Sequence, residues 1–145
     1  MHYCATVMVE PEYANNTWVR AIEILAPYDE AIDVEPYEVP CDGCTYYNGV
    51  CHECRGTGTR KTTYNPLSRY DYYHSLAEAD GHYEEIKPGD ATYAIVLPDE
   101  GWHSRARDGI VGNDRSAEEW QGVFEACYRT YTERGFIPVL IDCHI

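Results

Sequence analysis

Four cysteines lie within a short stretch of the chain and have the spacing of a metal site. Cys41, Cys44, Cys51 and Cys54 form two Cys-x2-Cys pairs. Each pair typically forms a tight turn that points both sulfur atoms in one direction, so two facing pairs complete the tetrahedron that zinc prefers. Sulfur would then occupy all four positions and leave none open for water, which predicts a structural zinc ion rather than a hydrolytic one. Iron in the same four-sulfur cage is the alternative.

Basic side chains and one histidine lie beside this cluster. We expect Arg55, Arg60 and Lys61 to offset the negative charge of four thiolates around one zinc ion. A local contact with nucleic acid is the alternative interpretation of these cations. His52 lies inside the second pair, and we expect it to face solvent rather than to bind the metal.

Tyrosines are frequent around and after the cluster. Tyrosine gives a large contact area at a low entropic cost, so an exposed group of tyrosines would form a docking surface. The alternative is a small core around the cysteines, and the two interpretations can hold for different residues. The predicted partner-binding residues are Tyr46, Tyr47, Tyr70, Tyr72 and Tyr73.

Metal-binding residue types also occur at the two ends of the chain. His2, Cys4, Cys143 and His144 would suggest a second metal site if the terminal strands are neighbours. Alternation along a strand argues against this site, because it places Cys143 among apolar side chains and Cys4 on the opposite side of its strand.

No familiar catalytic motif accompanies the acidic and histidine side chains. The chain has no GxSxG, HExxH, P-loop or dinucleotide-binding pattern. A histidine near carboxylates is common in an acidic protein, so we predict that the protein is not an enzyme. The catalytic candidates that we weighed against this prediction are Asp99, Glu100, His103, Asp108 and Asp114, together with His74 and His82.

The elements that position these residues follow from local patterns. Alternating apolar residues predict strands at 2–9, 91–97 and 136–145, and a turn at 98–101 predicts a hairpin partner for the second strand. Residues 32–39 and 59–64 have the composition of extended segments. Helical spacing predicts one helix at 18–25 and a second that begins at the capping pair Ser116 and Glu119 and ends before Gly135.

The order of these elements resembles the split βαβ pattern of ferredoxin-like folds. We therefore predict a single α+β domain over residues 1–145, with an antiparallel sheet and two helices on one face. The first and last strands would be neighbours, and the first would place Ala5 and Val7 beneath Trp18 and Trp120. The cysteine cluster would form an inserted zinc-knuckle hairpin at residues 40–64.

Charge and composition limit the possible partners. The 145 residues include 25 acidic and 11 basic side chains, which gives a formal charge of -14. Such a surface repels phosphate backbones, so general nucleic-acid binding is disfavoured and a protein partner with a basic surface is favoured.

Seven cysteines indicate metal thiolates in a reducing cytosol rather than disulfides. No apolar stretch approaches the roughly 18 residues of a membrane span, so we expect a soluble protein. The cysteine usage predicts that it is cytoplasmic.

The second cysteine pair carries a local resemblance. Residues 51–58, CHECRGTG, resemble the CxxCxGxG element of the DnaJ-type zinc domain, in which glycines let the chain turn closely after the knuckle. The first pair, CDGCTYYN, lacks these glycines, and the chain has no J-domain and no HPD signature. The resemblance therefore implies a protein-facing zinc hairpin without co-chaperone function.

A longer resemblance covers most of the chain. The segments LAPYDE, VEPYE, TTYNPLSRYDYY and IDCHI are similar to those of a group of small proteins encoded by tailed phages of actinobacteria. This resemblance implies the cytoplasm of an infected bacterium. Together with the charge, it favours a non-enzymatic protein that binds and modulates a host protein, in anti-defence or host takeover. The alternatives are a small enzyme of unknown reaction and a zinc-ribbon nucleic-acid module that uses Arg55, Arg60, Lys61 and Arg69.

Overall fold

The computed structural model describes residues 1–46, 51–78, 86–107 and 113–145 of the chain. The chain forms two compact units, which we call the sheet unit and the cysteine unit. The sheet unit combines Met1–Asp29 with Leu67–Ile145, and the cysteine unit is the inserted segment Glu30–Pro66. The insertion is therefore longer at both ends than the hairpin predicted at 40–64.

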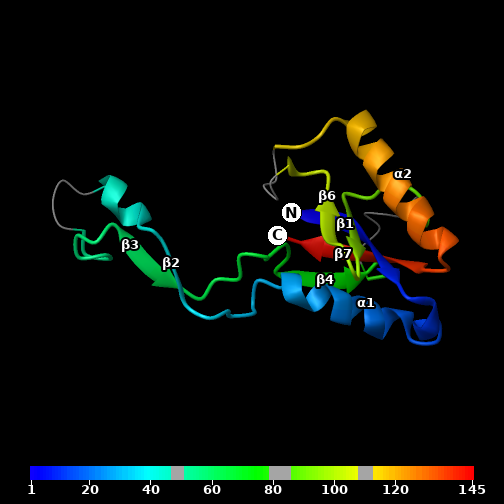
Figure 1. Cartoon of the computed structure of the whole chain (residues 1–145), viewed down its shortest axis with the longest axis horizontal. Helices are drawn as coiled ribbons and strands as arrows, with labels where there is room; N and C mark the ends of the chain where they lie inside the picture. The colour runs from blue at the N-terminus through cyan, green and yellow to red at the C-terminus, as the bar shows by residue number, and fades with distance from the viewer. Residues whose placement is uncertain (47–50, 79–85, 108–112) are drawn as a thin grey trace. The chain divides into compact units, whose positions relative to one another are not determined.

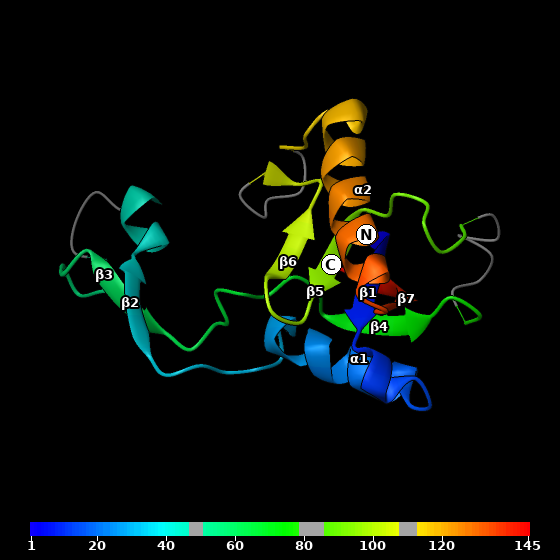
Figure 2. The same cartoon turned by 45° about the vertical axis from the view of Figure 1, so that its right-hand side comes forward.

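Five strands and two α-helices make up the sheet unit. The strands are β1 (His2–Val9), β4 (Tyr72–Ser75), β5 (Ala94–Leu97), β6 (Gly101–Ser104) and β7 (Ile137–His144), and the helices are α1 (Thr17–Leu25) and α2 (Ala117–Glu133). The strand order is β4-β7-β1-β5-β6 (Figures 1 and 2). β1 pairs with β7 in antiparallel orientation and with β5 in parallel orientation. The sheet is thus mostly antiparallel, and the predicted pairing of the first and last strands is confirmed.

The two helices cover opposite faces of this sheet (Figures 1 and 2). Leu25 of α1 belongs to one buried cluster with Val7, whereas Phe124 of α2 belongs to another with Met8. Successive side chains of a strand point to opposite faces, so both faces of β1 are covered. Within the described residues, no helix is both long and apolar enough to span a membrane.

The prediction that both helices lie on one face is wrong, and a ferredoxin-like topology is not confirmed. The second side of β1 is as well buried as the first. Met8 is fully buried in the cluster that includes α2 residues. Thr6 is buried as well, and a 2.8 Å hydrogen bond with the hydroxyl of Thr92 satisfies its own hydroxyl. Trp120 therefore packs on the α2 face, while Trp18 of α1 remains 38% exposed.

Local signals nevertheless predicted individual elements correctly. Helix α2 begins after Ser116, whose hydroxyl accepts the backbone N–H of Glu119 at 3.1 Å. The predicted hairpin is formed by β5 and β6, and its turn ends at Gly101, where φ is 85°. A positive φ of this size favours glycine, because a Cβ atom would strain the backbone.

The cysteine unit has a small sheet of its own and little apolar core. Strands β2 (Tyr37–Pro40) and β3 (Thr59–Thr62) pair in antiparallel orientation. Beyond the strands, the N–H of Val34 donates to the carbonyl of Thr63 at 2.9 Å, and the Thr63 hydroxyl donates to Asp33 at 2.8 Å. Within the part of this unit that the structure describes, the buried apolar side chains are those of Cys41, Cys51 and Cys54.

The chain leaves and re-enters the sheet unit at one place. The N–H of Arg69 donates to the carbonyl of Tyr28 at 2.8 Å, and an isolated bridge joins Asp29 to Tyr70. Tyr70 is buried and donates its hydroxyl to the carbonyl of Leu25 at 3.2 Å. The two ends of the insertion are therefore held together by the sheet unit itself.

We expect Phe124→Ala to destabilise the sheet unit by about 3–5 kcal/mol, because it removes a fully buried ring between α2 and the sheet. Urea unfolding followed by circular dichroism measures this loss. Val123→Ala is the matched control: its side chain is 37% exposed, so the free energy of unfolding should change by about 0.5 kcal/mol or less. Similar small effects of both variants would contradict the packing of α2.

Candidate metal centre

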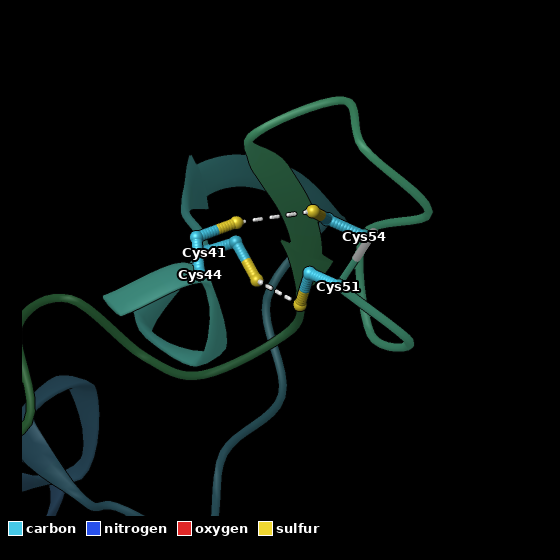
Figure 3. A group of neighbouring side chains, drawn as sticks. All are labelled: Cys41, Cys44, Cys51 and Cys54. Atoms are coloured by element: carbon cyan, nitrogen blue, oxygen red, sulfur yellow. Dashed lines mark hydrogen bonds between the residues drawn. The ribbon is translucent and has the colours of Figure 1, made fainter. Parts of the chain in front are cut away.

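The first cysteine pair is positioned by the end of β2 and the turn that follows it. The N–H of Cys41 donates to the carbonyl of Gly58 at 2.9 Å, which ties the first pair to the chain after the second. A short 3-10 helix, Asp42–Tyr46, then places Cys44 one turn later, where its N–H donates to the carbonyl of Cys41 at 3.3 Å. Both side chains point towards the second pair (Figure 3).

The second pair is followed by a tight turn that suits its glycine-rich sequence. The N–H of Arg55 donates to the carbonyl of Cys51 at 2.7 Å, and three residues after Cys54 have positive φ: Arg55 at 52°, Gly56 at 86° and Gly58 at 77°. This path aims the N–H of Gly58 at the Cys54 sulfur, 3.3 Å away. The glycines therefore allow the backbone to donate to a sulfur atom.

The four sulfur atoms have the geometry of a metal site. All lie within 4.8 Å of one another, and the two shortest contacts join the pairs: Cys41 to Cys51 at 3.6 Å and Cys44 to Cys54 at 3.3 Å (Figure 3). In a tetrahedron with metal–sulfur distances of about 2.3 Å, the sulfur atoms are about 3.8 Å apart. All seven cysteines of the chain are free of disulfides. The cluster could therefore hold one metal ion through four sulfur ligands.

Contacts between the sulfur atoms separate the pKa values of the thiols. The hydrogen bond from Cys44 lowers the pKa of Cys54 to about 6, and the N–H groups of Gly58 and Gly56 act in the same direction. The same contact with Cys54, together with desolvation, raises the pKa of Cys44 to about 12. Cys54 is thus the first of these two to become a thiolate. A metal must displace the remaining protons, so its affinity will fall as the pH falls.

The side chains predicted beside the cluster have different surroundings. Arg60 lies with its Nη2 atom 3.6 Å from Oδ2 of Asp42, so its charge is directed at a carboxylate. Arg55 and Lys61 are exposed. His52 is exposed as well, and the group of potential ligands found among the described residues contains the four cysteines without it.

The tyrosines predicted to bind a partner do not share one environment. Tyr70 is 1% exposed and belongs to the core of the sheet unit. Tyr73 is half-buried and packs edge-on against Tyr70, with ring centroids 5.9 Å apart. Tyr72 is 41% exposed. The side chain of Tyr46 and the whole of Tyr47 lie outside the described residues.

The terminal strands bring histidines and carboxylates together. Among the described residues the four-cysteine cluster is the one group with metal-site geometry, and the register of β1 and β7 places Cys4 and Cys143 on opposite faces. The nearby histidines instead form two carboxylate–imidazole pairs of 2.9 Å each, His2 with Asp142 and His144 with Asp71. These pairs were not predicted from the sequence, although Asp142 and His144 are two residues apart and so share one side of a strand.

Two of the acidic residues considered for catalysis, Asp99 and Asp114, have structural partners. The Tyr131 hydroxyl donates to Asp99 and lowers the pKa of that carboxyl. The Tyr93 hydroxyl donates to Asp114 at 2.9 Å. Two of the candidates lie outside the described residues, namely His82 and Asp108.

Gly43→Ala should weaken metal binding about tenfold, the lower end of the range for residues that support metal ligands. A Cβ atom at this position would lie 3.2 Å from the Cys51 sulfur and 3.0 Å from Oε2 of Glu53, so the sulfur must shift. Competition with a chelator measures the affinity. In the control Gly122→Ala the added Cβ meets no atom within 4 Å, and an equal loss there would contradict this explanation.

Comparisons with known proteins supply no further assignment. No family model, curated protein or solved structure matches the chain. The chemistry of the site is therefore inferred from the residues of this chain alone.

Proposed function

We propose that Cys41, Cys44, Cys51 and Cys54 hold one structural zinc ion in a non-enzymatic protein. This protein binds and modulates a host protein with a basic surface, in the cytoplasm of a phage-infected bacterium. Anti-defence activity or host takeover are the roles that fit such binding. The zinc ion stabilises one unit of the protein, and the acidic surface attracts the partner.

The small size and small apolar core of the cysteine unit support the assignment of a structural zinc ion. The unit is about 37 residues long, and units below about 40 residues usually need a metal, disulfides or a partner to fold. Its described residues bury three cysteines and no larger apolar side chain. Four sulfur ligands select zinc or iron, and a closed tetrahedral site is the usual structural zinc site.

The charge imbalance is the observation that carries the partner assignment. The chain has 11 basic and 25 acidic side chains. Among the described residues, six of the basic ones pair with carboxylates: Arg20, Arg60, Arg105, Arg107, Arg115 and Arg134. The remaining acidic surface would speed association with a basic protein. The pairing of Arg60 with Asp42 also weakens the alternative of a nucleic-acid module, which would need this cation for phosphate.

An exposed tyrosine would supply the binding specificity that charge alone does not give. Long-range attraction steers a partner but gives little specificity, whereas a desolvated aromatic anchor contributes much of the binding energy. Tyr72 is the exposed member of the described tyrosines that we predicted to bind. Its ring is held by stacking on His144, with centroids 4.4 Å apart, so little conformational freedom would be lost on binding.

Protein purified without chelators should contain one zinc ion per chain by elemental analysis. Removal of the metal under reducing conditions should unfold residues 30–66 while the sheet unit keeps its signals in an amide NMR spectrum, because the sheet unit has its own core. Cys44→Ser should lose the metal, whereas the control Cys127→Ser, a cysteine of α2, should retain it. Iron in place of zinc, or a cysteine unit that stays folded without metal, would contradict the proposal.

Tyr72→Ala should abolish capture of a protein partner from a bacterial lysate while leaving the zinc content unchanged. The control is Tyr64→Ala in the cysteine unit, a tyrosine that is 50% exposed and outside the predicted set. Mass spectrometry of the captured protein identifies the partner and the charge of its surface. Undiminished capture by Tyr72→Ala would exclude this tyrosine as the anchor, and failure of the wild-type chain to capture any partner would contradict the function.

A further inference from the structure

A cavity of about 410 Å³ lies at the open edge of the sheet, where β6 approaches α2. Its volume falls in the range of about 300–1,000 Å³ that small-molecule sites occupy. Among the described residues β6 is the last strand of the sheet, so none of their strands covers this edge. The side chains that matter for its chemistry are Arg69, Trp102, His103, Ser104, Arg115 and Trp120.

The lining of this cavity has a charge opposite to that of the whole protein. Two guanidinium groups and one imidazole line it, and no carboxylate does so among the described residues. Arg69 forms no ion pair with any described residue; its Nη1 atom donates to the carbonyl of Ser68 at 2.7 Å. The Arg69 Nε atom is buried without a hydrogen-bond partner among the described residues, so this half-buried guanidinium could donate to a bound anion.

The second arginine is held in place by the backbone at the end of β6 and just after it. Arg115 donates through Nη1 to the carbonyls of Ser104 and Ala106, which fixes its guanidinium at the edge of the strand. Within the part of the chain that the structure describes, Arg115 pairs with the carboxylate of Glu119, 3.7 Å from its Nε atom. Glu119 also accepts from Arg107 at 2.7 Å, so one negative charge is shared between two cations. The surroundings of the cavity therefore keep a positive charge.

We propose that this cavity binds the phosphate group of a mononucleotide, an activity separate from the binding of a protein partner. Arg69 and Arg115 would hold the phosphate, since guanidinium groups match its geometry and charge. His103 lines the same cavity, and its Nε2 atom has no hydrogen-bond partner among the described residues. The indole rings of Trp102 and Trp120, which also line the cavity, would contact the base.

The three tryptophans allow a direct test by NMR. Adenosine 5′-monophosphate should shift the indole N–H signals of Trp102 and Trp120 and leave that of Trp18, on α1, unchanged. Inorganic phosphate should compete with it at constant ionic strength but bind more weakly, and adenosine without phosphate should bind more weakly still. Arg69→Gln should raise the dissociation constant at least tenfold, whereas Arg129→Gln, an exposed arginine of α2 with the same change of charge, should leave it unaltered.

Several results would overturn the proposal. These are absence of shifts at Trp102 and Trp120, equal affinity for adenosine and its monophosphate, or equal effects of the two arginine substitutions. Equal affinity for inorganic phosphate and the nucleotide would show that the base is not bound and would overturn the assignment to a mononucleotide. If Arg69→Gln changes the amide spectrum of the sheet unit, His103→Gln replaces it as the test. His103→Gln should also weaken binding of the nucleotide.

Discussion

The burial of β1 on both faces is the constraint on which the sheet unit depends. Its two edges pair with β5 and β7, and its two faces carry the clusters that contain α1 and α2. A slip of one residue would exchange the side chains of the two faces and place Met8 where Val7 now packs. The register of β1 therefore sets that of its neighbours, and through them the positions of β4 and β6.

The cysteine unit depends on a different interaction. It has a two-stranded sheet, which is marginally stable in water without further packing, and its described residues bury little apolar surface. Its backbone instead positions the sulfur atoms. Glycines with positive φ and a short 3-10 helix bring the four thiols within 4.8 Å of one another. Hydrophobic burial stabilises one unit, and we infer that coordination of a metal stabilises the other.

Features with local signals were predictable from the sequence, whereas those that depend on tertiary packing were not. The cap at Ser116 and the spacing of the cysteines each depend on a few neighbouring residues. The faces that the helices cover could not be predicted in this way. The side of β1 that faces α2 carries Thr6, and the partner of its hydroxyl, Thr92, lies far along the chain. The same holds for the core position of Tyr70 and for the cavity, whose two arginines come from segments 46 residues apart.

The hydrogen bond between Tyr28 and Arg69 joins the two positions of the sheet unit between which the cysteine unit is inserted. Because the sheet unit already holds these two positions together, a chain of almost any length could join them at a small entropic cost, which rises only slowly with loop length. The insertion could thus be gained, lost or exchanged during evolution without disturbing the strands on either side. Such an exchange would leave the proposed anchor Tyr72 in place, because this tyrosine lies on β4 of the sheet unit.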